Sequence, residues 1–153
     1  SAEIKQSICK TEPKNSECFY DFIDTKSWIY STLEAQEKFD EASQGYDQAI
    51  IDLKKLTEEN NNANKWKFRL ANYYLLSANV RIRLRDFSTA EERADEGIII
   101  LSRLVALDPS NNEWKQTLIR GQNIILDIAK KNTIESELIP PKIGNDAAQT
   151  KSS

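Results

Sequence analysis

Two cysteines are the residues of this chain whose spacing most directly suggests a chemical bond. Cys9 and Cys18 enclose eight residues, among them Pro13. A disulfide between them would stabilise the fold by about 2–4 kcal/mol in the loop-entropy picture. It would also place the chain in an oxidising, extracytoplasmic compartment such as the periplasm, whereas two reduced thiols would not. The polar flanking segments slightly favour the disulfide and therefore the extracytoplasmic location.

Little else in the chain could carry out catalysis. It contains no His, which removes the commonest general base and a main zinc ligand. Its four glycines, Gly45, Gly97, Gly121 and Gly144, are scattered and form no phosphate-binding loop. Carboxylate pairs arise on any acidic helical surface and therefore indicate no acid–base site. We expect a protein that is not an enzyme and that has no cofactor or metal site.

Composition narrows the class of partner. The 153 residues suit one domain, and 21 basic against 24 acidic residues give a net charge of −3, which disfavours nucleic acid. No apolar stretch approaches the roughly 18–20 residues that span a bilayer, so we expect no membrane insertion by this segment. Because the chain starts at Ser1 and has no Met, we expect it to be a fragment of a longer protein.

Apolar residues recur at spacings of three and four, which predicts amphipathic helices. The pattern predicts five helices over residues 16–38, 40–59, 64–85, 88–107 and 111–132, with a break at 24–26 as the alternative for the first. The polar residues 1–15 predict an extended arm. The weaker pattern and small polar residues of 133–153 predict a flexible tail.

Two helix starts carry a capping-box pattern, Ser-x-x-Glu. Ser88 precedes Glu91 and Ser110 precedes Glu113. In this motif the Ser side chain accepts from a free backbone N–H and the Glu reaches back to the Ser. We therefore expect Ser88 and Ser110 to cap the last two helices.

A shift of 48 positions lays one part of the chain over another. Between Phe39–Leu70 and Phe87–Leu118, 11 of 32 residue pairs are identical. The identities fall on apolar helix positions and on the pair Trp66 and Trp114, which is how a stacked repeat preserves its core. We therefore expect core packing for both tryptophans; stacking on a ligand is the alternative.

With these residues in view, the chain resembles the tetratricopeptide repeat family. Ala42 and Ala90 match the small residue that opens the second helix of each repeat, and Gly97 matches the small position where paired helices approach closely. The 48-residue period exceeds the family's usual length of about 34. Tyr30 also stands where a small residue is expected. The chain is most similar to a long-helix bacterial subgroup with the phrase "L..L...DPSN.EW...L", here Leu101 to Leu118.

The resemblance implies a fold and a kind of function. The fold is all-α: antiparallel helix pairs stacked as a short right-handed superhelix of five helices, with units at 16–60 and 64–108 and a final helix at 111–132. The function is a protein- or peptide-binding scaffold module of a larger bacterial signalling or membrane-associated protein. The alternative is a helical spacer or self-association module, which would leave Phe19, Phe22 or Trp28 on the first helix, or Ile124 or Ile128 on the last, exposed.

The resemblance also implies where a ligand would bind, along the face formed by the first helix of each pair. The matching positions are Asp24, Ser27, Ser31 and Glu34 in the first helix; Asn72, Leu75, Asn79, Ile82 and Arg83 in the third; and Arg120, Asn123, Asp127 and Lys130 in the last. An Asn side chain can grip a peptide backbone as donor and acceptor. The alternative for each position is an ordinary solvated side chain.

Four arginines, Arg69, Arg81, Arg83 and Arg85, could form a basic strip for a carboxylate or phosphate. Such arginines more often pair with acids near them. We therefore favour pairing, with acids such as Glu91, Glu92 and Asp95 as the candidates.

Overall fold

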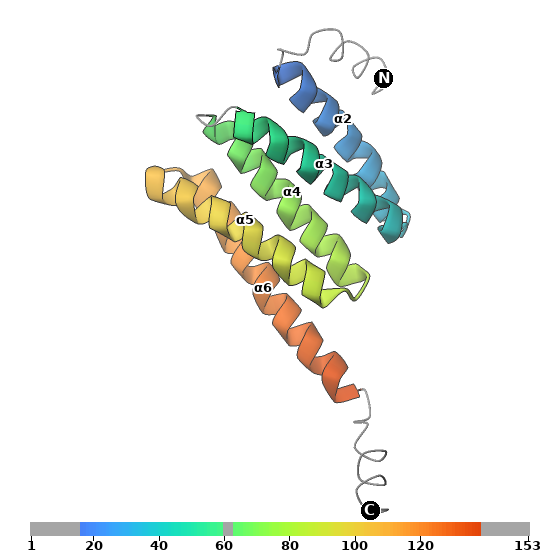
Figure 1. The fold of residues 1–153 in the computed structure, drawn as a ribbon. Helices are drawn as coiled ribbons and strands as arrows, with labels where there is room; N and C mark the ends of the chain where they lie inside the picture. The colour runs from blue at the N-terminus through green and yellow to red at the C-terminus, as the bar shows by residue number, and fades with distance from the viewer. Residues whose placement is uncertain (1–15, 60–62, 139–153) are drawn as a thin grey trace, which may run out of the picture.

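Five α-helices form the regular structure of the residues that the computed structural model describes, 16–59 and 63–138. They are α2 (Ser16–Ala35), α3 (Phe39–Glu59), α4 (Asn64–Arg83), α5 (Phe87–Leu107) and α6 (Asn112–Leu138). Consecutive helices run antiparallel through short connections, and α6 extends beyond its neighbours (Figure 1). The prediction of an all-α fold with five helices is confirmed. Residues 1–15 and 139–153, predicted as arm and tail, lie outside the described residues.

The first and last helices depart from their predicted bounds. α2 ends at Ala35 and is continuous through residues 24–26. The hydroxyls of Thr25 and Ser27 there donate to helix carbonyls three or four residues earlier (2.8 and 2.7 Å). α6 continues past 132 to Leu138, so the predicted tail was wrong over residues 133–138. There Glu135 accepts a hydrogen bond from Arg85 at 3.3 Å, which ties the last turns of α6 to the end of α4.

The 48-residue shift relates the helix boundaries as well as the sequence. The matching boundaries are the ends of α2 and α4 (Ala35 and Arg83), both bounds of α3 and α5 (Phe39–Glu59 and Phe87–Leu107), and the starts of α4 and α6 (Asn64 and Asn112). The pairs α2–α3 and α4–α5 are therefore copies of one helical unit, and α6 matches the first helix of a third.

The turn inside each unit has the same backbone conformation. Glu37 and Arg85, 48 positions apart, both have a positive φ of 60°. In both turns the N–H of this residue donates to the carbonyl three residues earlier, and the next N–H donates to the carbonyl five residues before it (2.8–3.0 Å). This is the Schellman motif, which satisfies the free carbonyls at a helix end.

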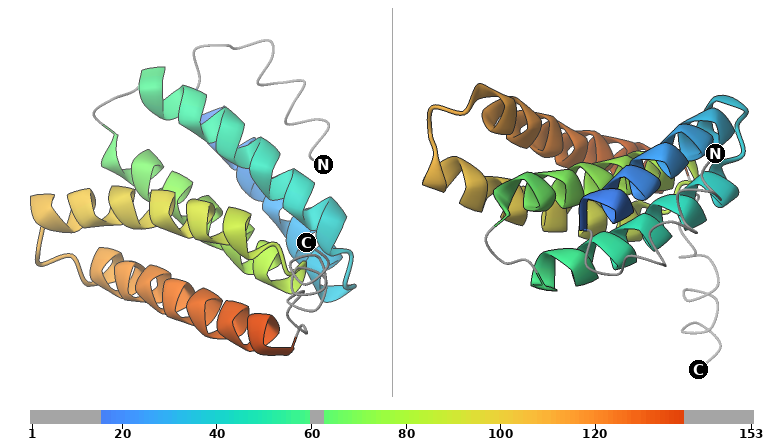
Figure 2. Two further views of the ribbon diagram at one scale, coloured as in Figure 1. Left: turned by 60° about the horizontal axis from the view of Figure 1, so that its bottom comes forward. Right: turned by 90° about the horizontal axis from the view of Figure 1, so that it is seen from above.

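Two apolar cores share α4. The first joins α2, α3 and α4 around Tyr46, Leu53 and Val80, and the second joins α4, α5 and α6 around Leu101 and Ile124. Seen from above in Figure 2, α2 and α6 lie toward one side of α4 and α3 lies toward the other. α4 is therefore the central element, in contact with helices on both sides.

At one contact between paired helices, the large and the small residue lie on opposite helices in the two units. In the first unit Tyr30 of α2 packs on Gly45 of α3, where an added Cβ would lie 2.2 Å from the ring carbon Cε1. The equivalent positions in the second unit hold Ala78 and Arg93. The presence of Tyr30 at the position expected to be small is therefore compensated by a glycine on the facing helix.

Both predicted caps are wrong by one or two residues. The side chain of Asp86, and not that of Ser88, accepts from Thr89 N at 3.4 Å at the start of α5. At the start of α6, Asn111 accepts from Trp114 N at 3.1 Å in place of Ser110. Ser110 instead donates its hydroxyl to Asp108 at 2.5 Å. Asp and Asn are at least as good N-caps as Ser, so the better-placed acceptor takes the role.

A polar cluster ties α3, α4 and α5 together. The Asp47 carboxylate accepts hydrogen bonds from Ser77 (2.8 Å), Arg81 (2.5 Å) and Arg93 (3.2 Å). Arg81 also reaches Asp86 at 3.3 Å. Burial alone would raise the pKa of Asp47, but the three hydrogen-bond donors outweigh it and lower that pKa. These charges hold the two units to each other.

Candidate binding groove

The face of α4 that lies between α2 and α6 carries two hollows, which together we call the groove. Hollow 1, about 670 Å³, lies along the N-terminal half of α4, with Asp21, Asp24 and Ser27 of α2 on one side. Hollow 2, about 470 Å³, lies along the C-terminal half, with Ser31 and Glu34 of α2 on one side and α6 on the other. α4 has 20 residues and is therefore about 30 Å long at 1.5 Å per residue. An extended peptide of roughly nine residues would cover this length.

Hollow 1 contains a preformed ion pair. Arg69 Nη2 lies 2.9 Å from Asp24 Oδ2, with both side chains about a third exposed. The Tyr73 hydroxyl donates to the other carboxylate oxygen of Asp24 at 3.2 Å and to the carbonyl of Ile23 at 3.3 Å. Burial, with the Asp24 carboxylate nearby, raises the pKa of Tyr73 well above its usual range. Tyr73 therefore stays a neutral donor that orients Asp24.

Trp66 forms part of the wall of hollow 1. Its side chain is 9 % exposed and belongs to the first core, so the prediction of core packing is confirmed. The cations of Lys65 and Arg69 lie 4.3 and 5.3 Å from its ring centroid, within range of a cation–π interaction. Trp114 is half-buried, with its ring centroid 6.5 Å from that of Phe68.

Hollow 2 presents both signs of charge. Arg83 lies over the Phe39 ring, 5.0 Å from its centroid, and in the described part of the chain no acidic side chain forms an ion pair with it. Burial raises the pKa of Glu34, and the Arg83 charge partly opposes that rise. Asp127 and Lys131, both on α6, form an ion pair at 3.2 Å. Arg83 is therefore the cation of hollow 2 that is available to an anionic group.

Nine of the thirteen predicted groove residues line one of the two hollows. They are Asp24, Ser27 and Asn72 in hollow 1, and Ser31, Glu34, Asn79, Ile82, Arg83 and Asp127 in hollow 2. Arg120, Asn123 and Lys130 are exposed on α6 but line neither hollow. Residues from three helices are thus brought to one face.

The prediction for Leu75 was wrong. Its side chain is 2 % exposed and packs in the second core, where an added Cβ on Gly97 or Gly121 would lie 3.0 or 3.4 Å from Leu75 Cδ2. A leucine that points at two glycines fills the space between helices and cannot reach a ligand. The side-chain amide of Asn72 is already used in a hydrogen bond within α4, because its Nδ2 donates to the Phe68 carbonyl at 3.0 Å.

Several hollow-lining residues were not predicted from the sequence: Asp21, Lys65, Phe68 and Glu113 in hollow 1, and Lys131 in hollow 2. A signal existed for two of them. Asp21 is three residues before Asp24, and Lys131 is four after Asp127, so both follow the helical repeat from a predicted position. Lys65 and Glu113 lie in the first turns of α4 and α6, where a face is hard to assign before the helix start is known.

Three of the four arginines form ion pairs, but with other acids than those expected, and Arg83 forms no ion pair with the described residues. Arg69 pairs with Asp24, Arg81 with Asp47 and Asp86, and Arg85 with Glu135. No ion pair among residues 16–59 and 63–138 involves Glu91, Glu92 or Asp95. Most of these partners lie more than 30 positions away in the chain, so sequence proximity could not identify them.

The surfaces that would support self-association are partly buried. Phe22, Ile124 and Ile128 are 4 %, 7 % and 3 % exposed, whereas Trp28 is 78 % exposed. The side chain of Phe19 lies outside what the structure describes. Other exposed apolar residues lie on α6: Ile119, Leu126, Ile134 and Leu138.

The remaining predicted features concern cysteine, metals and membranes. Cys18 is not a free thiol, but Cys9 lies outside the described residues, so the Cys9–Cys18 bridge stays a prediction. Within residues 16–59 and 63–138, no group of three or more Cys, Asp or Glu side chains could hold a metal ion. No helix in these same ranges is long and apolar enough to cross a membrane.

Comparison with known proteins adds no family assignment. No protein-family model matches the chain, and no curated protein matches it significantly. The helix arrangement and the chemistry of the groove are therefore the basis on which a function can be proposed.

Proposed function

We propose that the chain is a protein- or peptide-binding module and that its ligand lies along the groove. The observation that carries this proposal is the convergence of α2, α4 and α6 on two adjoining hollows, lined by hydroxyl, amide and charged side chains. Such groups can pair with a peptide backbone and with charged side chains, whereas a structural interface would bury apolar residues. The roughly 30 Å length of α4 suits an extended segment or a helix better than a small molecule.

The residues of the groove have different roles in this proposal. Asn79 is exposed, and Arg83 is exposed with its guanidinium held over Phe39, so both contact ligand in hollow 2. The Asp24–Arg69 pair in hollow 1 is already satisfied, so it would set the register of a ligand more than its affinity. Trp66 supplies an apolar wall.

The wider setting of the module is part of the same proposal. The duplicated helix pairs and the resemblance to long-helix tetratricopeptide repeats support a scaffold within a larger bacterial signalling or membrane-associated protein. A Cys9–Cys18 bridge would place that scaffold outside the cytoplasm.

A helical spacer or self-association module is the second candidate, and one observation favours it. Trp28 at one end of the stack is 78 % exposed, and Leu126 and Leu138 at the other are 67 % and 77 % exposed. Apolar side chains at both ends of a helical stack could continue the stack with another copy. Sedimentation at several concentrations tests this directly, because a concentration-independent monomer contradicts it.

The groove is tested by affinity capture from the source lysate with two variants of the full chain. The test variant is Asn79→Ala with Arg83→Ala. The control is Gln44→Ala with Lys55→Ala, which also removes one neutral polar group and one cation, from exposed positions on α3. We expect the parent and the control to capture the same partner and the test variant to lose it. Equal capture by all three would place the binding face elsewhere and contradict the proposal.

A further inference from the structure

A third hollow lies between α3 and α5, on the opposite side of α4 from the groove; we call it the basic slot. Its floor is apolar: Leu70 and Leu104 are 5 % and 1 % exposed, Ile100 is half-buried, and Leu107 at the margin is 68 % exposed. Its volume is about 260 Å³, below the roughly 300–1,000 Å³ of small-molecule pockets. The slot therefore suits one or two anchoring side chains of a larger partner.

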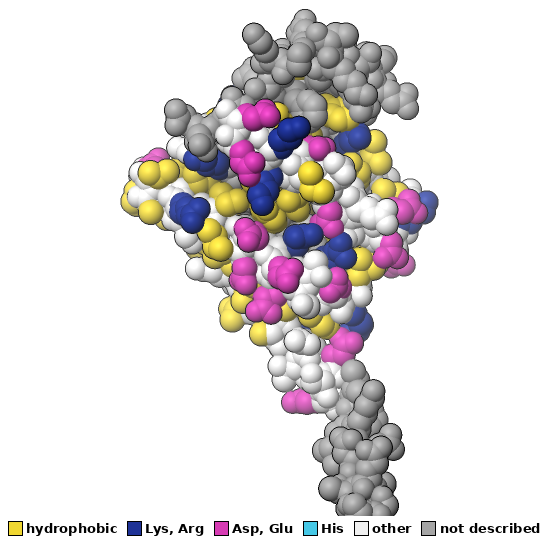
Figure 3. All heavy atoms as spheres, in the orientation of Figure 1, with side chains coloured by type: hydrophobic (Ala, Val, Ile, Leu, Met, Phe, Trp, Pro, Cys, Tyr) yellow, Lys and Arg dark blue, Asp and Glu magenta, His cyan; other side chains and the backbone are white. Residues whose placement is uncertain are grey.

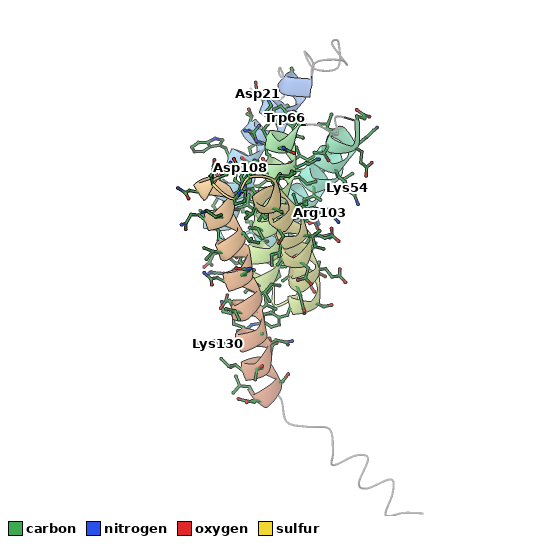
Figure 4. The ribbon with its side chains drawn as sticks, turned by 90° about the vertical axis from the view of Figure 1, so that its left-hand side faces the viewer. Asp21, Lys54, Trp66, Arg103, Asp108 and Lys130 are labelled. Carbon is green, nitrogen blue, oxygen red and sulfur yellow. The ribbon has the colours of Figure 1, made fainter. Side chains whose placement is uncertain are left out.

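The rim of the slot is positively charged. Lys54, Lys67 and Arg103 line it with a single acid, Glu58, and none of these four forms an ion pair among the residues that the structure describes. Figure 4 shows Lys54 of α3 and Arg103 of α5 on the same side of the stack, away from Lys130 of α6. On a chain with a net charge of −3, this is a local excess of positive charge beside an exposed apolar surface.

The charges on the rest of this face favour a narrow partner over a broad anionic surface. In Figure 3, hydrophobic surface is exposed with Lys and Arg side chains around it, and acidic side chains gather beside it on the same face. Glu92, Asp95 and Glu96, on the N-terminal half of α5, are exposed. A flat anionic surface such as a bilayer would meet these acids as well as the cations, and like charges repel. A narrow segment can contact the slot without meeting them.

We propose that the basic slot binds an acidic amphipathic segment of a protein partner. A Leu-like side chain of that segment packs against Leu104 and Leu107, and flanking carboxylates pair with Lys54, Lys67 and Arg103. Apolar anchors in small pockets carry most of the affinity in such contacts, and the surrounding charges set specificity and association rate. This site is separate from the groove, so the chain would hold two segments on opposite faces.

The probe is a fluorescein-labelled 12-residue peptide of alternating acidic residues and leucines, measured by fluorescence anisotropy against the full chain. Arg103→Glu and Leu107→Asp are the test variants; both positions are exposed, so folding should be retained, and circular dichroism verifies it. Arg120→Glu is the matched control, a charge reversal at an exposed position of α6. A peptide with Lys in place of each acidic residue controls for charge, and vesicles containing phosphatidylserine test the membrane alternative.

We expect the acidic peptide to bind and the Lys peptide not to bind. Each test variant should weaken binding about tenfold, a typical loss for one anchor or one charge pair, and Arg120→Glu should leave it within about twofold. The proposal is overturned if the acidic peptide does not bind, if all variants bind it equally, or if vesicles bind and the peptide does not. Sedimentation that shows a dimer lost in Arg103→Glu would overturn it too, by assigning the slot to a second copy.

Discussion

The contact between Gly45 and Tyr30 gives a prediction whose sign can be worked out from the structure. A Cβ at position 45 would lie 2.2 and 2.3 Å from two carbons of the Tyr30 ring, so the ring must move by about 1.3 Å to reach an ordinary van der Waals distance of about 3.5 Å. It cannot move freely, because it packs edge-on against Tyr46, 5.5 Å between centroids, and Tyr46 is 1 % exposed. Overpacking of this kind costs about 2–3 kcal/mol. The better helix propensity of Ala returns about 1 kcal/mol.

We therefore expect Gly45→Ala to lower the free energy of unfolding by about 1–2 kcal/mol. In a Tyr30→Ala background the clash is gone, and the same substitution should raise the free energy of unfolding by up to about 1 kcal/mol. The four proteins of this double-mutant cycle are compared by urea unfolding, followed by far-UV circular dichroism. A stabilising effect of Gly45→Ala in the parent, or the same effect in both backgrounds, would refute the compensation between these two residues.

Three further predictions test the turns, the polar cluster and the caps. Glu37→Gly should raise the free energy of unfolding, measured by urea denaturation, by about 0.5 kcal/mol. A left-handed φ costs a non-glycine residue about 1–2 kcal/mol, and the flexibility of Gly in the unfolded chain offsets part of the gain from removing this cost. A loss of stability would contradict the assignment of the Schellman motif. Because the pKa of Asp47 is lowered in the folded state, its stabilising contribution is present above its ordinary value of 3.8 and is lost as pH falls through the folded-state pKa. Asp47→Asn should therefore reduce stability at pH 7 and flatten the loss of stability below about pH 4, as followed by unfolding at each pH; an unchanged acid profile would contradict this. Asp86→Ala should cost about 1 kcal/mol and Ser88→Ala almost nothing, and equal losses in thermal unfolding would contradict the assignment of the cap.

The arrangement of the helices could be predicted from the sequence because each helix has an apolar stripe of its own. The identities across the 48-residue shift, such as Trp66 with Trp114, indicate which helices are equivalent. Equivalent units place their first helices on one face. This is why most of the predicted groove residues on α2 and α4 line the two hollows. Leu75 was misassigned because an apolar residue near the edge of a stripe can turn toward either the groove or the next helix.

What could not be predicted depends on contacts between distant parts of the chain. The partner of Arg81 is Asp47, 34 positions away, and the partner of Arg85 is Glu135, 50 positions away. The positive φ at Glu37 leaves no mark in the sequence, because Glu does not favour that conformation. The basic slot combines residues of α3, α4 and α5, and its charge excess becomes visible only once these helices are packed together.

We propose above that a protein partner lies against α4 between α2 and α6. Site-specific photo-crosslinking can locate this partner. A benzophenone amino acid is placed in the full chain at position 79 in hollow 2 or, as the control, at position 44, which is exposed on α3. We expect one covalent adduct with a single partner from position 79 and none from position 44. An adduct from position 44 alone, or the same adducts from both positions, would contradict it.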